Sequence, residues 1–405
     1  MKIKSIILAF VLIVIVNLIG CSKKDIVIIN DLTLSSAVDP YANIKIAFGS
    51  NIDPAKLLNY SKQFIPNYIN LDNGKSNPIT ESKATLGRVL FYDKNLSIDN
   101  TISCSSCHKQ IFAFGDTALQ SKGVQNGLSI RHAMRLVNSR FSNESKFFWN
   151  ERAASLEIQT TMPIQDHAEM GFSGQSGRAN MSNLLTKLSG IPYYKELFRF
   201  TYGDTIISET RLQESFAQFI RSIQSFDSKY DQGRALVNNE NAPFENFTAE
   251  ENSGKTLFLT PPQFDGNSTR IAGGLGCNGC HKAPEFSIDS TTRNNGIIGT
   301  IGSTALDLNN TKSPSLRDLL DSTGKAHTPM MHTGQHKTIQ EVLSHYNAIS
   351  LVRNTNIDPK LRPNNSGQQL KMTAAEINAI VAFMKTLTGK AVYTDKRWGN
   401  PFLVQ

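Results

Sequence analysis

The chain of 405 residues is poor in cysteine, with five in all, and four of them fall in two pairs. Its formal net charge is +8, yet it lacks a run of lysine and arginine interleaved with aromatic residues, which argues against a nucleic-acid partner. No strand-rich stretch stands out, so we expect a mainly α fold. One apolar run, from Ile6 to Val16, is too short for a comfortable membrane-spanning helix.

The two cysteine pairs share one pattern, because Cys104–His108 and Cys277–His281 both read C-x-x-C-H. This is the attachment signature of c-type haem, in which the thiols add across the vinyl groups and the histidine becomes the proximal iron ligand. A single copy could arise by chance, or be a redox or zinc pair. Two copies, without further cysteines to complete zinc sites, favour two covalent haems. The predicted attachment residues are Cys104, Cys107, Cys277 and Cys280, and the predicted iron ligands are His108 and His281.

The N-terminus has the pattern of an export signal. Lys2 and Lys4 precede the apolar run from Ile6 to Val16, and Leu18–Cys21 resembles the bacterial lipobox. That resemblance implies cleavage before Cys21 and lipidation there; a simple secretory signal and an uncleaved anchor are the alternatives. Because c-type haem is attached on the outer side of the bacterial inner membrane, we expect a lipid-anchored protein of the cell envelope, facing the periplasm or on the outer surface.

An internal repeat precedes the two haem motifs. Gly87–Phe91 and Gly254–Phe258 both read G-[RK]-x-L-F on amphipathic helical stretches. The repeat predicts two cytochrome c-like haem domains in tandem. The expected organisation is a signal peptide at 1–20, a tether and lead-in at 21–77, an N-terminal haem domain at 78–240 and a C-terminal haem domain at 241–405.

Helical periodicity marks several further segments. We expect helices at Met181–Leu188 and Glu209–Phe226, and a short helix in the lead-in near Pro54–Gln63. Thr373 and Glu376 form a capping box that begins a terminal packing helix.

The segments around the motifs resemble a known family. In order they are Phe148–Ala153, Ser155–Gln159, Pro163-Ile164, Glu169–Gly171, Ser313–Arg317, Met331–Gly334, His345–Asn347 and Val381–Gly389. Together with the haem motifs they are similar to the bacterial dihaem cytochrome c peroxidases and the related MauG-like proteins. The resemblance implies that the N-terminal haem reduces hydrogen peroxide to water. The C-terminal haem would supply electrons from a small donor protein of cytochrome c or cupredoxin type.

The resemblance also implies roles for single residues. Glu169 matches a distal glutamate, which takes a proton from one peroxide oxygen and returns it to the other. Gln159 and Pro163 match residues of the same distal pocket, and Trp149 matches a tryptophan between the haems. Without the family pattern, Glu169 would be interpreted as an exposed loop residue and Trp149 as a core residue.

Two axial positions follow from the same comparison. A histidine that closes the N-terminal haem in many relatives falls at Val124, which cannot ligate iron, so we expect an open distal face. His132 is the nearby alternative ligand; its other interpretation is a hydrogen-bonded loop residue. Tyr346 is the expected sixth ligand of the C-terminal haem, as in MauG-like proteins, and Met331 is the alternative. Met330, His332 and His345 also lie nearby in sequence.

Calcium is a doubtful cofactor. Many relatives bind it between the domains through an asparagine and two carbonyls, which fall here at His132, His327 and Pro329. Calcium prefers oxygen ligands, so the loss of the asparagine argues against the site, although water can substitute.

Two other functions are compatible with the sequence. A MauG-like dihaem oxidase would act on a different substrate, and the assignment of Tyr346 favours it. A non-enzymatic electron-transfer cytochrome would keep both irons six-coordinate, and the distal set of Gln159, Pro163 and Glu169 argues against it. A homodimer is compatible with the sequence.

Overall fold

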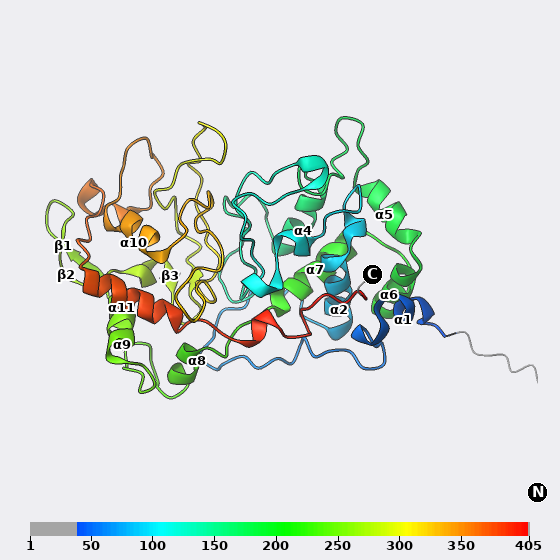
Figure 1. The fold of residues 1–405 in the computed structure, drawn as a ribbon, viewed down its shortest axis with the longest axis horizontal. Coiled ribbons are helices and arrows are strands. Elements are labelled where there is room, and N and C mark those ends of the chain that lie inside the picture. The colour runs from blue at the N-terminus through cyan, green and yellow to red at the C-terminus, as the bar shows by residue number, and fades with distance from the viewer. Residues whose placement is uncertain (1–38, 404–405) are drawn as a thin grey trace, which may run out of the picture. The chain divides into compact units, whose positions relative to one another are not determined.

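Helices dominate residues 39–403, the part of the chain that the computed structural model describes (Figure 1). The α-helices are α1 (Ala42–Phe48), α2 (Glu81–Tyr92), α3 (Cys104–Cys107), α4 (Leu156–Gln165), α5 (Met181–Ser189), α6 (Pro192–Tyr202), α7 (Glu209–Ser222), α8 (Lys229–Arg234), α9 (Ala249–Leu259), α10 (Ile339–Asn347) and α11 (Ala374–Lys385). Two antiparallel strand pairs accompany them: β1 (Pro262–Phe264) with β2 (Arg270–Gly273), and β3 (His281–Lys282) with β4 (Ser287–Ile288). The expected mainly α fold is confirmed.

The predicted signal peptide and Cys21 lie outside the described residues. Between residues 39 and 403, no helix is long and apolar enough to cross a membrane.

The repeated glycines bring two pairs of helices into equivalent close contact. A Cβ atom on Gly87 of α2 would lie 2.0 Å from the carbonyl oxygen of Ser215 in α7. A Cβ atom on Gly254 of α9 would lie 1.9 Å from the carbonyl oxygen of Ala379 in α11. Each glycine also faces a phenylalanine one turn further along the partner helix, Phe219 or Phe383. The repeat in the sequence therefore corresponds to a repeated mode of helix packing.

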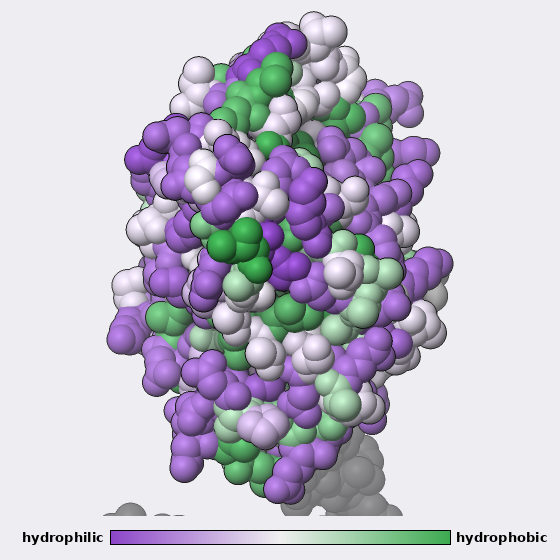
Figure 2. Space-filling view, turned by 90° about the vertical axis from the view of Figure 1, so that its left-hand side faces the viewer, coloured by the Kyte–Doolittle hydropathy of each residue, from purple (hydrophilic) through white to green (hydrophobic). Residues whose placement is uncertain are grey.

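The buried apolar side chains form two large clusters. The first is built on α1, α2 and α4 to α7. The second is built on α8 to α11. The molecular surface on the side of β1, β2 and α10 is mostly hydrophilic, with small hydrophobic areas (Figure 2). The helix expected at Glu209–Phe226 ends at Ser222, while the capping box of Thr373 and Glu376 begins α11 as expected.

The chain crosses back to the first cluster after α11. Val392 and Trp398 are buried in that cluster, although both lie within residues 241–405, the range predicted for the C-terminal haem domain. Two hydrogen bonds fix the returning segment on α2: Arg88 Nε donates to Gly399 O at 2.7 Å, and Tyr92 Oη donates to Trp398 O at 2.6 Å. In Figure 1 the red segment that follows α11 runs back toward α2.

The helix of the lead-in lies at a different place from the one expected. It is α1, whereas the segment near Pro54–Gln63 consists of turns and extended chain. Glu196 of α6 accepts hydrogen bonds from the backbone amides of Asn43 and Ile44, at 3.2 and 2.9 Å. A carboxylate remote in sequence thus satisfies the first amides of α1, which local patterns cannot reveal.

Candidate active site

Two cavities bring together the residues that the sequence singled out. The first contains about 1520 Å³ of empty space, including space open to solvent. Its lining includes Cys104, Cys107, His108, Trp149, Gln159, Pro163 and Glu169. The second contains about 1910 Å³. Its lining includes Cys277, Cys280, His281, Met331, Tyr346 and again Trp149. The last residue of each repeat, Phe91 or Phe258, lines the corresponding cavity.

The local fold of the first motif leaves one ring nitrogen of His108 able to bind a metal. Cys104 begins the short helix α3, and His108 N donates to Cys104 O at 2.9 Å. The imidazole Nδ1 of His108 donates to the carbonyl of Phe114 at 3.0 Å. Ala113 and Phe114 both have positive φ, 53° and 61°, in the turn that presents this carbonyl. Because Nδ1 is the donor, Nε2 carries the lone pair that can bind iron.

The second motif occupies a 3₁₀ turn followed by a strand. Cys277–Gly279 forms the turn, and His281 lies in β3 opposite Ile288 of β4. Burial lowers the pKa of His281 to about 4, so its imidazole is neutral, the form that binds a metal. Its Nδ1 is buried and has no hydrogen-bond partner.

The cysteine pairs lack the further ligands of a structural zinc site. Within residues 39–403 no group of three or more His, Cys, Asp and Glu side chains could hold a metal ion. A structural zinc needs four such ligands, so the described residues do not fit the zinc alternative. Without a metal, burial raises the pKa of Cys104 and Cys277 to about 12, and that of Cys107 and Cys280 to about 11.

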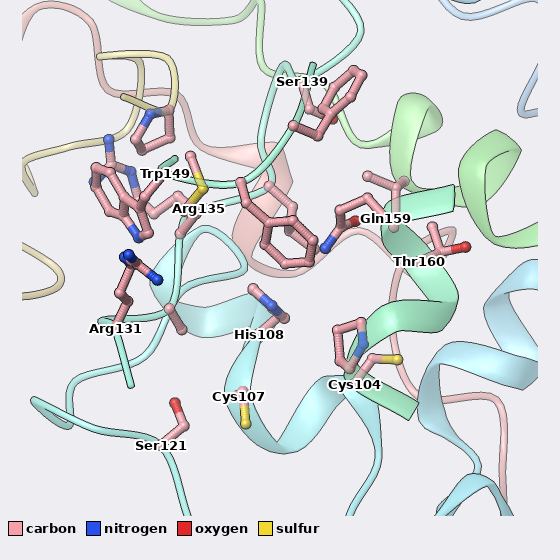
Figure 3. Close-up of a pocket in the computed structure, with 18 of the residues that line it drawn as sticks. Cys104, Cys107, His108, Ser121, Arg131, Arg135, Ser139, Trp149, Gln159 and Thr160 are labelled. Atoms are coloured by element: carbon pink, nitrogen blue, oxygen red, sulfur yellow. The ribbon is translucent and has the colours of Figure 1, made fainter. Parts of the chain in front are cut away.

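Helix α4 presents two of the predicted distal residues on one face. Gln159 and Pro163 are four residues apart, so their side chains lie one above the other. Gln159 faces the same cavity as His108 (Figure 3).

The chain turns sharply after α4 and places Glu169 in the cavity. The side chain of Asp166 accepts hydrogen bonds from the amides of Ala168 and Glu169, at 2.8 and 3.0 Å. Burial, helped by the charge of Asp166 and opposed by Arg152, raises the pKa of Glu169 to about 7. Glu169 also lies close enough to raise the pKa of both Cys104 and Cys107. Its carboxyl group can therefore hold or release a proton near neutral pH beside the first motif.

Val124 lies next to the Glu169 loop. It is buried, and its amide donates to Glu169 O at 2.9 Å. The histidines that line the first cavity are His108 and His132. The open distal face therefore stays a prediction.

One asparagine contacts both candidates for the sixth ligand in the second cavity. Asn295 Nδ2 donates to the sulfur of Met331 at 3.4 Å. Asn295 also hydrogen-bonds the phenol of Tyr346, which lowers the pKa of Tyr346 against the larger effect of burial, which raises it. Burial outweighs the hydrogen bond from Asn295, so the pKa of Tyr346 is raised overall and the protonated phenol is favoured before a metal binds. Asn295 was missed in the sequence analysis.

Trp149 lies in the wall that the two cavities share. Its indole Nε1 donates to His132 O at 2.7 Å, and its ring centroid lies 6.3 Å from that of His332. The backbone amide of Lys312, from the second half of the chain, donates to Trp149 O at 2.8 Å. Arg135 also lines both cavities and was missed, because an isolated arginine in a loop gives no signal in the sequence.

The position expected for the calcium-binding asparagine does not fit calcium. His132 is buried there, and its Nδ1 donates to Ala118 O at 3.0 Å. An imidazole offers no oxygen ligand, so we assign no role to calcium.

Comparisons with known proteins agree with this geometry. Residues 81–240 match the model of the di-haem cytochrome c peroxidase family. The chain is 29% identical over 328 residues to methylamine utilization protein MauG of Methylophilus methylotrophus, covering 78% of this chain and 85% of that protein. It is 27% identical over 324 residues to cytochrome c551 peroxidase of Nitrosomonas europaea, covering 77% and 81%.

Solved structures also resemble this fold. A MauG-like protein associated with microbial copper homeostasis superposes with a TM-score of 0.63 at 25% identity, covering 83% of this chain and 98% of that chain. The diheme peroxidase BthA of Burkholderia thailandensis shares the fold, with a TM-score of 0.54 over 84% of this chain and 90% of that chain, at 19% identity. Residues 81–240 therefore match the di-haem cytochrome c peroxidase family, and most of the chain is similar to MauG and to cytochrome c peroxidases, di-haem oxidoreductases whose family implies two c-type haems.

Proposed function

We propose that this protein is a dihaem peroxidase that reduces hydrogen peroxide to water with electrons from a small donor protein. The observation that carries the proposal is Glu169, a carboxyl group with a pKa raised to about 7 in the same cavity as Cys104, Cys107 and His108. A pure electron carrier has no need of an acid and base beside its iron ligand.

The chain would hold one haem in each cavity. Cys104 and Cys107 would attach the first covalently, and Cys277 and Cys280 the second, with His108 and His281 as proximal ligands. When bound, the haems supply redox-active iron and the path for electrons. The neutral imidazole of His281 and the oriented imidazole of His108 suit this role.

Glu169 would manage the protons of the reaction. The carboxylate takes a proton from one oxygen of hydrogen peroxide and returns it to the leaving oxygen, so that water departs. Overall, one hydrogen peroxide, two protons and two electrons yield two waters. Gln159, on the same cavity, would orient the peroxide through its amide, and Pro163 would keep that face of α4 apolar.

Electrons would enter at the second cavity and reach the first past Trp149. This indole lines both cavities, and its orientation is fixed by the hydrogen bond to His132 O. Tyr346 would be the sixth iron ligand there, because it lines the second cavity together with Cys277, Cys280 and His281; Met331, which lines the same cavity, is the alternative.

The protein would work at the cell envelope. Cleavage before Cys21 and lipidation of that residue would anchor residues 22 onward to a membrane, facing the periplasm or the outer surface. Gel filtration of the holoprotein tests whether it forms a homodimer.

A direct test is the stoichiometry of peroxide reduction. The purified holoprotein is mixed with hydrogen peroxide and a reduced small cytochrome c, and the consumption of both is followed. We expect two donor molecules to be oxidised for each peroxide consumed. Absence of donor oxidation, with both haems attached, would refute the peroxidase.

The second candidate is a MauG-like oxidase that uses peroxide to oxidise a different substrate. The position of Tyr346 in the second cavity favours it, because a phenolate ligand would stabilise ferric iron and lower the potential of the second haem. In that case peroxide would be consumed without matching oxidation of the donor.

A further inference from the structure

The wall between the two cavities contains a buried cation that no neighbouring carboxylate neutralises. Arg135 is 6% exposed and lines both cavities. Its Nη2 donates to Ser315 O at 2.8 Å, whereas its Nε has no hydrogen-bond partner. Burial lowers the pKa of Arg135 to about 10, so the guanidinium is still charged at neutral pH. A buried charge of this kind is strongly destabilising unless an anion pairs with it.

The protein itself does not supply that anion. Asp318 is the carboxyl group whose charge acts on Arg135, but Arg135 forms no ion pair among residues 39–403. Asp318 Oδ1 already accepts hydrogen bonds from Tyr393 Oη and Gly389 N, both at 2.8 Å. Burial raises the pKa of Asp318, which favours its neutral form. By contrast, the nearby Arg131 is paired with Asp307 at 2.6 Å.

A second unpartnered nitrogen lies on the same wall. His132 is 3% exposed and lines both cavities. Its Nδ1 donates to Ala118 O, while its Nε2 is buried and has no partner. Because Nδ1 carries the proton, Nε2 offers a lone pair, so Arg135 is the group on this wall that can donate hydrogen bonds to an anion.

We propose that Arg135 forms a carboxylate-binding site where the cavities meet, and that it takes a propionate side chain of a haem. The inference rests on the haem binding of the proposed function. A guanidinium is a planar donor that matches a carboxylate. Attachment through the vinyl groups fixes one edge of a haem at Cys104 and Cys107, and the propionates leave from the other side of the ring. Arg135 lies across His108 from these cysteines (Figure 3).

The site has a consequence for the redox chemistry. Reduction removes one positive charge from a haem iron, so a nearby cation stabilises the reduced state. Arg135 therefore raises the reduction potential of the haem whose propionate it binds. Because Trp149 lies on the same wall, pairing of Arg135 with a propionate also shields the indole from the positive charge.

The test is the reduction potential of each haem, measured by spectroelectrochemistry on the holoprotein. We expect Arg135→Gln to shift the potential of at least one haem to a lower value, and Arg135→Lys to restore most of the shift. Arg140→Gln is the matched control, because Arg140 pairs with Asp72 and lines neither cavity; it should leave both potentials unchanged. Potentials that stay unchanged in Arg135→Gln, with both haems attached, overturn the proposal.

Further measurements separate the other occupants. If a free anion fills the site, the wild-type potentials will depend on phosphate concentration and those of Arg135→Gln will not, which overturns the assignment to propionates. If Asp318 is the true partner, Asp318→Asn will reproduce the loss of thermal stability in Arg135→Gln while both variants keep the wild-type potentials. His132→Asn should leave the spin state of both ferric haems unchanged; a change to high spin would make His132 an iron ligand instead. A wild type without attached haem would refute the proposed function rather than this site.

Discussion

Trp149 donates its indole Nε1–H to the backbone carbonyl of His132 at 2.7 Å, in the wall between the two cavities. A carbonyl accepts the hydrogen bond but is too weak a base to take the proton. The indole is therefore held in one orientation and keeps its proton during electron transfer. This hydrogen bond connects the loop that follows the first motif to Trp149, which lines both cavities.

The position of Trp149 predicts a selective kinetic defect. Trp149→Phe removes the indole and its hydrogen bond, so donor-driven turnover should fall while the KM for peroxide stays near the wild-type value. Trp398→Phe is the matched control, because Trp398 is buried in the first cluster and lines neither cavity. Stopped-flow oxidation of the reduced donor checks the result; equal turnover by the two variants would contradict it.

The raised pKa of Glu169 predicts a pH dependence. The carboxylate is the form that takes a proton from peroxide, so kcat/KM for peroxide should rise as the pH increases through about 7. Below that pH the carboxyl group is protonated and cannot act as the base. Initial rates between pH 5 and pH 8, measured at constant ionic strength, test this. A profile that is flat across neutrality would argue against Glu169 as the base.

The contacts of Asn295 predict which side chain binds the second iron. Tyr346→Phe should change the spectrum of the ferric C-terminal haem, whereas Met331→Leu should leave it unchanged. Asn295→Ala frees the sulfur of Met331 and removes the hydrogen bond to Tyr346, so the potential of that haem should rise. Asn295→Gln, which keeps an amide, should restore part of the wild-type potential. An altered spectrum in Met331→Leu alone would identify Met331 as the ligand.

The close contact between α9 and α11 predicts a loss of stability. Gly254→Ala would place a Cβ atom 1.9 Å from Ala379 O, which forces the helices apart and should destabilise the fold by about 1–3 kcal/mol. Gly266→Ala is the matched control, since no atom lies within 4 Å of its added Cβ. Thermal unfolding of the two holoproteins compares them. Equal melting temperatures of the two variants would show that α9 and α11 accommodate the added methyl group, which would contradict the prediction.

The residues around the haem motifs could be predicted because their chemistry is local in sequence. A C-x-x-C-H motif carries both attachment and ligation, and Trp149 and Glu169 of the family pattern line the same cavity as the first motif. The repeat at Gly87 and Gly254 was informative for the same reason, since each glycine faces a partner helix at an equivalent position.

The features that were missed depend on contacts between distant parts of the chain. Helix α1 begins where the carboxylate of Glu196 accepts a hydrogen bond from the backbone amide of Ile44. The segment after α11 is held against α2 by the hydrogen bond from Arg88 to Gly399 O. Arg135 has no special pattern in the sequence, and only its burial without a counter-ion makes it notable. Such contacts are set by the fold and carry no local periodicity.

The proton chemistry assigned to Glu169 is the central claim, and one comparison tests it most directly. Peroxide turnover with a reduced donor is measured for the wild type, Glu169→Gln and Glu144→Gln. Glu144 is a matched control because it lines the same cavity and its pKa is also raised, to about 8, but the charges acting on it are those of Lys312 and Glu151 rather than groups near the first motif. We predict that Glu169→Gln lowers kcat/KM by about 10²–10⁴-fold and that Glu144→Gln stays close to the wild type. Undiminished turnover by Glu169→Gln, with both haems attached, would contradict the account.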